Sequence, residues 1–304
     1  MCTGVDVAIS GAGGLIGTAL AESLRADGHR VLRLRRGAVT GGDDIGWDPE
    51  SGRIDAPALE GLDAVVHLAG EGIGARRWTA DQKARILGSR VKGTETVAAA
   101  VASRARKPRV FISASGINYY GDRGDEVLTE DGSAGDDFLA RVCTQWEAAT
   151  RPAADAGVRA VQLRTGIVLA SHGGALARML LPFRLGLGGR IGSGRQWMSW
   201  ITLADHVAAI RHVIDTPSLR GAVNSTAPNP VPNSEFVRTL ARVLRRPALL
   251  PTPLLPLKLR YGGELVETLL LYSMRVVPAR LEESGFRFAH PRLEDALRAV
   301  LDRH

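Results

Sequence analysis

A glycine-rich turn near the start of the 304-residue chain has the spacing of a dinucleotide-binding site, Gly11-x-x-Gly14-x-x-Gly17. Alternating apolar residues precede it, as in a short buried strand. One glycine permits backbone angles closed to other residues, another lets the backbone approach a pyrophosphate, and a third lets helix pack on strand. A helix starting at Leu15, with Ile16 in its first turn, would direct unpaired N–H groups at the phosphates. The spacing differs from the commoner G-x-G-x-x-G, so the prediction rests on the strand–turn–helix context.

Two arginines at the end of the next predicted strand indicate which dinucleotide binds. The residues 30–34 alternate like a strand, and Arg35 and Arg36 follow them. An acidic residue at this position would bind the ribose 2′-hydroxyl of NAD, whereas arginine accommodates a 2′-phosphate. The sequence therefore predicts NADP(H) as the cofactor, with Arg35 and Arg36 on the phosphate. The alternative is that both arginines only face solvent at a strand end.

Hydroxyl side chains follow a later predicted strand, which ends at Ser113. Ser115, Tyr119 and Tyr120 come directly after it. Ligands of open α/β sheets bind at the carboxyl ends of the strands, so these hydroxyls could bond a substrate carbonyl or supply a proton. Arg90, on a long predicted helix, would lower the pKa of a neighbouring tyrosine through its positive charge. The alternative is that the two tyrosines only shape the loop.

Further cofactor contacts are expected from the ends of other strands. Trp47 could flank the adenine and Asp48 could meet its amino group; a buried tryptophan with a turn aspartate is the equally supported alternative. His67 is interpreted as a packed strand histidine rather than a catalyst. The remaining predicted cofactor-binding residues are Leu68, Ala69, Gly70, Ser113, Arg164 and Gly166.

The order of strand and helix patterns predicts an α/β fold: a Rossmann-type doubly wound parallel sheet with a small, discontinuous C-terminal α/β lobe. The predicted NADP(H)-binding Rossmann domain comprises residues 1–165 and 195–221, and the small substrate-side lobe comprises 166–194 and 222–304. In the lobe, the glycine-rich loop with Arg190 and Arg195 is interpreted as an anion site or as a flexible lid.

Three more segments of the lobe are interpreted from their composition. A helix from Ala175 to about Leu187 is expected to kink or break at Pro182. The proline-rich run 247–256 is expected to be an extended connection. The apolar helix expected at 259–272 would line the substrate cleft, form a homodimer contact or belong to the core.

Composition limits the partners and the compartment. The chain is 45% hydrophobic and 23% charged, which is typical of a soluble globular protein. Its net charge of +7 comes from scattered arginines without a long basic run, so no nucleic-acid partner is expected. Cys2 and Cys143 are the only cysteines, and the histidines show no ligand spacing, so no metal site is predicted. A strand soon after Met1 leaves no room for a signal peptide, and no apolar run suits a membrane span; a cytoplasmic location without a membrane partner is predicted.

Together these motifs resemble the extended short-chain dehydrogenase/reductase superfamily, of the sugar-nucleotide epimerase/dehydratase kind. Within it the chain is most similar to an atypical branch, the YfcH-like NAD(P)-binding epimerase family proteins with a C-terminal domain of unknown function. The resemblance covers almost the whole chain and implies a Rossmann core, NADP(H) binding and a small substrate-side domain. The residues on which it rests are 11–17, 47–49, 67–70, 89–91, 113–115, 119–121, 146–147, 163–166, 188–189, 192–201, 205, 224–228 and 233–236.

The chain departs from the superfamily at the catalytic positions. Counting back from Glu147, the usual Tyr-x-x-x-Lys pair falls on Leu139 and Cys143, which cannot take over proton transfer. The active-site asparagine of the superfamily falls on Arg90. An arginine that binds the nucleotide diphosphate of sugar-nucleotide substrates falls on Met198. The resemblance implies that Ser115 occupies the position of the catalytic serine, while a standard nucleotide-sugar epimerase is disfavoured.

Two functions remain open from the sequence. One is an NADP(H)-binding oxidoreductase or epimerase-like enzyme that acts on an unidentified small molecule. If the arginine-bearing glycine loop binds this molecule, the molecule is expected to be an anion. The other is a non-catalytic NADP(H)-binding or redox-sensing protein that acts through a protein partner. Ser115 favours the enzyme, and the missing tyrosine–lysine pair favours the sensor.

Overall fold

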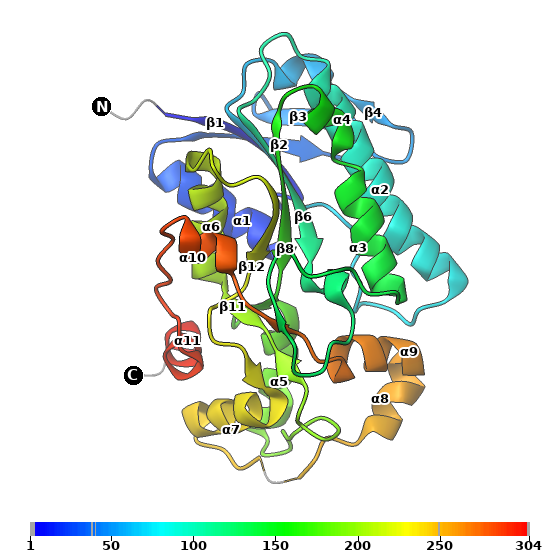
Figure 1. The fold of residues 1–304 in the computed structure, drawn as a ribbon, viewed down its shortest axis with the longest axis vertical. Helices are drawn as coiled ribbons and strands as arrows, with labels where there is room; N and C mark the ends of the chain where they lie inside the picture. The colour runs from blue at the N-terminus through cyan, green and yellow to red at the C-terminus, as the bar shows by residue number, and fades with distance from the viewer. Residues whose placement is uncertain (1–3, 38, 40, 249, 303–304) are drawn as a thin grey trace.

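An eight-stranded sheet forms the centre of the computed structural model, which describes residues 4–37, 39, 41–248 and 250–302 (Figure 1). The strand order is β12-β8-β6-β5-β1-β2-β3-β4, and every neighbouring pair is parallel except β3 with β4. The strands are β1 Asp6–Ser10, β2 Arg30–Arg35, β3 Asp44–Asp48, β4 Arg53–Ile54, β5 Ala64–His67, β6 Val110–Gly116, β8 Arg159–Thr165 and β12 Gly221–Ser225. This confirms the predicted doubly wound α/β class.

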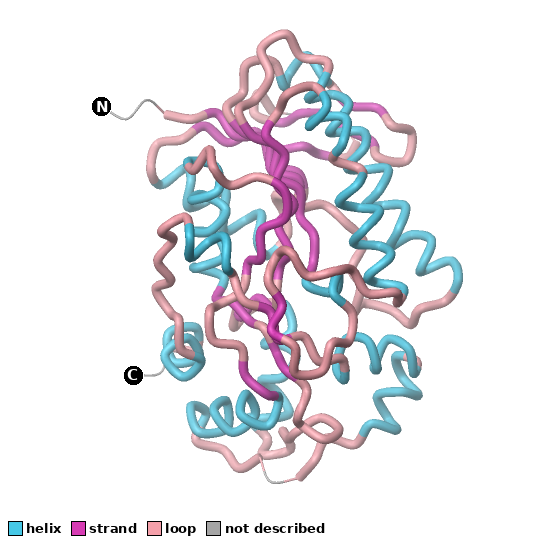
Figure 2. The backbone as a smooth tube through the Cα atoms, in the orientation of Figure 1, coloured by secondary structure: helices cyan, strands magenta, loops and turns pink. Residues whose placement is uncertain are grey.

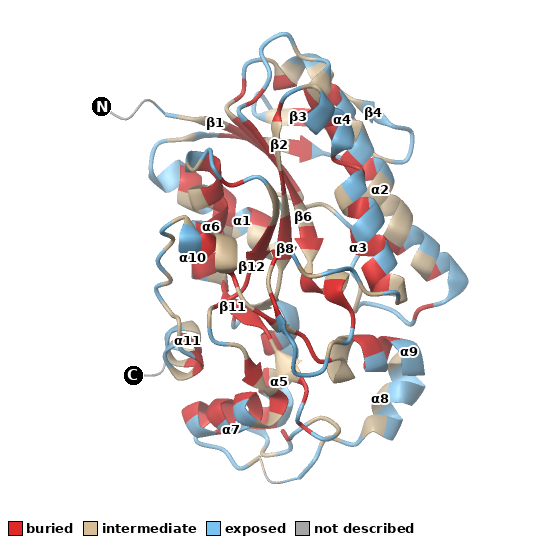
Figure 3. Ribbon diagram, viewed as in Figure 1, coloured by how far each residue is buried: buried red, intermediate tan, exposed pale blue. Residues whose placement is uncertain are grey.

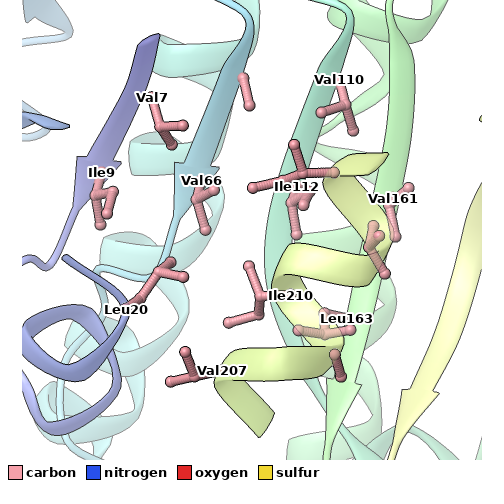
Figure 4. Packing of buried hydrophobic residues seen from close by; sticks show 14 of the residues in the cluster. Val7, Ile9, Leu20, Val66, Val110, Ile112, Val161, Leu163, Val207 and Ile210 are labelled. Carbon is pink, nitrogen blue, oxygen red and sulfur yellow. The ribbon is translucent and has the colours of Figure 1, made fainter. Parts of the chain in front are cut away.

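Helices cover both faces of the sheet, as Figures 1 and 2 show. Two lie on one face and three on the other: α1 Leu15–Ala26 and α6 Leu203–Asp215, opposite α2 Ala80–Ala102, α3 Phe138–Ala148 and α4 Arg151–Asp155. Figure 4 shows the first face, where Val7, Ile9 and Val66 of the strands pack with Leu20 of α1 and Ile210 of α6. Because helices bury both faces, the first residues of β5 and β6 and the middle of β1 form continuous buried apolar runs, and polar residues follow at the carboxyl ends of these strands.

A second hydrophobic core lies in the lobe below the sheet. It packs α5 Gly174–Arg184, α7 Asn233–Leu244 and α11 Leu293–Val300 against β9 Ile167–Leu169 and β11 Trp200–Thr202. β9 pairs with β11, and two further short ladders join β10 Trp197–Met198 to β13 Val231–Pro232 and β7 Val127–Leu128 to β14 Arg275–Val276. The remaining elements are α8 Leu254–Tyr261, α9 Gly263–Val266, α10 Ala279–Glu283, the 3-10 turns Ala56–Leu59 and Ile117–Tyr120, and a π-helical turn Glu267–Leu271.

The lobe and the sheet share more of the chain than the predicted domain boundary implies. β12 pairs with β8 along its whole length, so the predicted boundary between residues 221 and 222 falls inside a strand of the main sheet. Leu281 of α10 belongs to the core beneath α1 and α6, and Phe286 and Phe288 pack against it. The strand 221–225 was missed because it is short and ends in polar residues.

Three predictions for the lobe are wrong in detail. The helix expected at 259–272 is interrupted at Gly262, whose φ of +93° only glycine adopts readily, and α8 begins within the segment expected to be extended. Pro182 lies inside α5, which continues past it and ends at Arg184, so the helix is not broken there. Figure 3 shows that α8 is largely exposed; it contributes no buried residue.

The topology creates a switch point between β1 and β5. From β1 the chain moves outward through β2 and β3, then returns to the other side of β1 with β5. The loops after β1 and β5 therefore leave in opposite directions at the carboxyl edge of the sheet. In open α/β sheets this crevice is where ligands bind.

Two buried histidines are expected to make stability depend on pH. Burial lowers the pKa of His67 and His206 from 6.5 to about 4, so each is neutral in the fold. As the pH falls, the histidines of the unfolded chain bind protons before the buried ones do. We therefore expect the contribution of these histidines to the free energy of unfolding to be complete above pH 6.5 and to be lost as the pH falls from 6.5 towards 4. Each histidine lowers the free energy of unfolding by at most about 1.4 kcal/mol per pH unit. Urea unfolding at each pH measures this slope. Replacing the exposed His172 with glutamine should leave the slope of the wild type unchanged. If His67→Gln had the same slope as the wild type, His67 would not be a source of the pH dependence.

Candidate functional site

The glycine-rich turn has the backbone geometry that the sequence predicts. Gly11 has a φ of +70°, and the Gly14 N–H donates to the Gly11 carbonyl oxygen at 2.9 Å. A Cβ atom on Gly17 would lie 2.3 Å from that same oxygen, so the first turn of α1 packs against the turn at a distance that only glycine allows.

The N-terminus of α1 is open to an anion. Gly14 is its N-cap and provides no side-chain hydrogen bond, and the first turn contains no acidic residue. Gly13 and Gly14 are exposed, and a Cβ on Gly13 would meet nothing within 4 Å. Leu15 packs against Gly173 at the start of α5, which brings the lobe up to the turn. Exposed backbone N–H groups at an uncapped helix end fit a dinucleotide pyrophosphate.

Ser10, at the end of β1, connects β1 to the segment that follows β5 through hydrogen bonds, and the sequence did not predict this role. Its hydroxyl accepts hydrogen bonds from the backbone N–H groups of Leu68 (3.1 Å) and Ala69 (3.3 Å), and therefore donates to Nδ1 of His67 (2.7 Å). His67 is fully buried, as predicted for a packed strand histidine. The only signal in the sequence was a polar residue at the end of a buried strand. The bonds hold 68–70 beside Gly11, whose Cβ would lie 3.0 Å from the Ala69 nitrogen.

The arginines at the end of β2 share one buried carboxylate. Asp44 accepts from Nε of Arg33 at 2.8 Å and from Nη1 of Arg35 at 3.2 Å, and its side chain is 2% exposed. Arg33 was not among the predicted cofactor contacts, because the pairing of β2 with β3 that brings Asp44 beside it is not visible in the sequence. Arg36 is exposed. The ion pairs thus hold the guanidinium groups of Arg33 and Arg35 where β2 pairs with β3, near the carboxyl end of β2.

Trp47 and Asp48 have the burial and the turn geometry of the structural alternative. Trp47 is 6% exposed, and its ring packs edge-on against His67 with the centroids 5.6 Å apart. Asp48 accepts from the Glu50 N–H (3.0 Å) and the Ser51 hydroxyl, which forms a turn and lowers the pKa of the carboxyl group. The structure thus shows a buried tryptophan and a turn aspartate, while the contact of these residues with adenine stays a prediction.

Ser115 lies at the carboxyl end of β6 and is held by a buried ion pair. Its hydroxyl donates to Oε1 of Glu147 at 2.8 Å. Arg164 donates two hydrogen bonds of 2.9 Å to the same carboxylate, one to each oxygen. The side chain of Arg164 is 4% exposed. Arg164 also donates to the Tyr120 hydroxyl at 2.9 Å, which in turn donates to Oδ1 of Asn224 at 2.7 Å. This network links α3, β6, β8 and β12.

The network corrects the roles expected for the tyrosines and for Arg164. Tyr120 has no exposed surface, and burial raises the pKa of its phenol to about 12, so it is closed to a substrate. Arg164 is engaged with protein partners rather than free for a cofactor, and its Cζ lies 3.4 Å from the ring centroid of Tyr119 and 5.0 Å from that of Tyr120. Arg164, and not Arg90, is therefore the cation that lies against both tyrosine rings. Tyr119 is half-buried and is the accessible member of the pair.

Arg90 lies instead beside the end of β5. Its guanidinium rests against Gly70, where a Cβ would be 3.3 Å from Cζ, and 4.9 Å from the ring centre of Trp146. Cys143, at the expected lysine position, is buried next to Ser115, and burial raises the pKa of its thiol to about 12. The group around Ser115 thus contains Arg90 and a neutral thiol where the superfamily has a lysine.

Three other predicted positions have structural partners. The Ser113 hydroxyl is buried and donates to the Ala114 carbonyl at 3.2 Å. A Cβ on Gly166 would lie 2.7 Å from the Ser199 carbonyl oxygen, so Gly166 packs against the lobe. In the glycine-rich loop, the Ile191 N–H donates to Asn233 Oδ1 at 2.8 Å. That loop is packed against α7 rather than standing free as a lid.

Two properties of the described residues limit the chemistry. Over the ranges that the structure covers, no helix is long and apolar enough to cross a membrane. In the same ranges, no group of three or more histidine, cysteine, aspartate or glutamate side chains is arranged to hold a metal ion.

Comparison with known proteins gives matches over nearly the full length. Residues 7–224 match the NAD-dependent epimerase/dehydratase family, and residues 252–300 match a domain of unknown function, DUF1731. Epimerase family protein MT2273 of Mycobacterium tuberculosis is 45% identical over 96% of each chain. Epimerase family protein SDR39U1 of Homo sapiens is 36% identical over 97% of this chain and 99% of the human one.

Solved structures of similar proteins have the same fold as this chain. The crystal structure of human SDR39U1 (isoform 2) with NADPH has a TM-score of 0.88 at 36% identity, covering 98% of this chain and 99% of that one. UDP-glucose 4-epimerase of Thermotoga maritima, crystallised with UDP-glucose, has a TM-score of 0.75 at 16% identity and covers 98% of both chains, which shows a common fold. With its sheet, its glycine turn and these relatives, the chain belongs to the NAD-dependent epimerase/dehydratase family and has the C-terminal domain DUF1731.

Proposed function

We propose that this protein is an NADP(H)-dependent oxidoreductase that acts on a small-molecule carbonyl compound or the corresponding alcohol. The observation that favours this function most is Ser115. A hydroxyl at the end of β6, fixed by a buried carboxylate–guanidinium pair, stands close to the crevice where a dinucleotide fits. The human relative crystallised with NADPH supports the choice of cofactor.

The nucleotide half of the site is assigned to three features. The uncapped N-terminus of α1, with the backbone of Leu15 and Ile16, takes the pyrophosphate. Arg35 and Arg36 take the 2′-phosphate, and Arg33 joins them because it shares Asp44 with Arg35. The backbone of 68–70, in which Gly70 is exposed, is assigned to the nicotinamide ribose.

The chemistry follows from the orientation of Ser115. Bound NADPH supplies a hydride. Because the Ser115 hydroxyl donates to Glu147, its oxygen can accept a hydrogen bond from the hydroxyl group of an alcohol substrate, which would lose its hydride to bound NADP⁺. For a carbonyl substrate, which bound NADPH would reduce, the Ser115 hydroxyl turns from Glu147 to donate to the carbonyl oxygen, and Glu147 stays paired with Arg164. Tyr119 is the accessible phenol that supplies or takes up the proton.

The test is turnover of NADPH with a panel of aldehydes, ketones and oxo acids. We expect carbonyl-dependent oxidation of NADPH by the wild-type protein, and a loss of kcat/KM of roughly 100-fold in Ser115→Ala, as expected for a group that orients the reacting atom. Ser103→Ala makes the same chemical change at the end of α2 and should leave turnover intact. Equal rates in Ser115→Ala and wild type would remove Ser115 from the mechanism.

A second candidate is an NADP(H)-binding sensor that acts through a protein partner. It is favoured by Leu139 and Cys143, both buried, at the positions of the usual tyrosine and lysine. Tight NADPH binding without oxidation by any carbonyl compound would favour it over the enzyme. The placement in the YfcH-like branch, the cytoplasmic location and a homodimer stay predictions.

A further inference from the structure

Arg90 is a half-buried cation without an acidic partner. In the described part of the chain, no carboxylate oxygen lies within 4 Å of its guanidinium, whereas Arg164 is paired with Glu147. Glu71 is close enough to attract Arg90, but its carboxylate accepts from Gln82 at 3.2 Å. A charge removed from water without a partner is costly, and proteins normally pair it.

The hydrogen bonds of Arg90 leave one edge of the guanidinium open. Nη1 donates to the backbone carbonyls of Glu71 (2.8 Å) and Ile86 (3.2 Å), which fixes the plane of the group. The Trp146 ring and the backbone of Gly70 both lie against the group. Within the described residues, the N–H groups of Nε and Nη2 have no acceptor. These two nitrogens form the edge of arginine that matches the two oxygens of a carboxylate.

The contacts of Arg90 place it between the segment that follows β5 and the residues around Ser115. Arg90 rests on Gly70 at the end of β5, and its charge acts on Cys143, which lies next to Ser115. Cys143 remains a neutral thiol and does not offset the charge of Arg90. The pyrophosphate, by contrast, is assigned to the N-terminus of α1.

We propose that Arg90 binds a carboxylate of the substrate, so that the protein acts on a small oxo or hydroxy acid whose reacting oxygen meets Ser115. This proposal rests on the proposed function and names its substrate class. A carboxylate fits better than a phosphate, because the open edge presents two parallel donors and no second cation joins it among the described contacts. It also moves the anion site from the glycine-rich loop, where the Ile191 N–H is already bonded.

The experiment titrates oxamate, and separately neutral oxamide, into the full-length protein saturated with NADP⁺, using calorimetry. We expect oxamate to bind the wild type and oxamide to bind far more weakly. Arg90→Gln should weaken oxamate binding about 10- to 100-fold, the size expected for hydrogen bonds to a charged group, and Arg90→Lys should recover part of it. Arg85→Gln is the matched control on the same helix, because Arg85 bonds only to the Gln82 side chain. NADP⁺ affinity and melting temperature, measured for every variant, report whether the fold is intact.

Each outcome decides the proposal. Equal oxamate binding by wild type and Arg90→Gln overturns it, as does absence of oxamate binding to a wild type that binds NADP⁺. Loss of NADP⁺ affinity in Arg90→Gln with oxamate binding retained assigns Arg90 to the cofactor and also overturns it. If no carbonyl supports NADPH oxidation, the proposed function fails, while the oxamate titration still decides the role of Arg90. If neutral ketones are reduced as fast as oxo acids, the enzyme stands and the acid specificity fails.

Discussion

Replacing Gly17 with alanine is expected to abolish NADPH binding at physiological concentration. The new Cβ atom would lie 2.3 Å from the Gly11 carbonyl oxygen and 2.8 Å from Cα of Ala12, and both are backbone atoms that cannot rotate away. Relief of the clash must push α1 away from the turn, which moves its N–H groups off the pyrophosphate. Loss of two hydrogen bonds to charged oxygens, at about 1.5 kcal/mol or more each, raises the Kd roughly 100-fold. Quenching of protein fluorescence by NADPH measures it.

A glycine elsewhere provides the control for Gly17→Ala. Gly88 lies in α2, and a Cβ there would meet nothing within 4 Å. Gly88→Ala should bind NADPH like the wild type and should be slightly more stable, because alanine favours the helix by about 1 kcal/mol. The displaced turn should also lower the melting temperature of Gly17→Ala, since overpacking costs about 1–3 kcal/mol. Unchanged NADPH affinity in Gly17→Ala would refute the assigned pyrophosphate site.

Arg164→Met is expected to lower the free energy of unfolding by about 3–5 kcal/mol, the largest stability effect we expect from a single change. The substitution leaves the Glu147 carboxylate, 14% exposed, without its cation, and it removes the donor to Tyr120. Because the network joins α3 to three strands, its loss loosens the end of the sheet beside Ser115. Urea unfolding followed by circular dichroism measures the change.

The double variant Arg164→Met/Glu147→Gln separates charge from packing. Removing both charges leaves no unpaired carboxylate, so it should unfold at a higher urea concentration than Arg164→Met alone. A loss below about 1 kcal/mol in Arg164→Met, typical of an exposed ion pair, would show that the carboxylate finds another partner.

Local patterns were sufficient to predict the α/β class, most strands of the sheet other than β12, the glycine turn and α1. Each depends on residues adjacent in sequence, such as a buried apolar run followed by glycines. Ser115 was found for the same reason, because its place after a predicted strand fixes the end of the sheet at which it lies.

Side-chain partners could not be predicted in the same way. Arg164 and Ser115 meet Glu147 only because β6 and β8 are neighbours in a given register, with α3 across their ends. Without the strand order, an arginine near a cofactor looks the same as an arginine in a buried ion pair. Trp47 was ambiguous for a similar reason: its burial depends on His67, 20 positions away on a strand that is not its neighbour.

Residues near the C-terminus pack against the central sheet, and this limits how the lobe can change during evolution. Leu281, with Phe286 and Phe288, fills the same apolar layer as the first strands of the chain, although the segment belongs to the portion that matches DUF1731. That portion is therefore no exchangeable module: cut out, it would expose these side chains and leave a gap beneath α6. We therefore expect substrate preference to change through substitutions within this lobe rather than through exchange of a separate domain, because the lobe completes the core of the nucleotide-binding half.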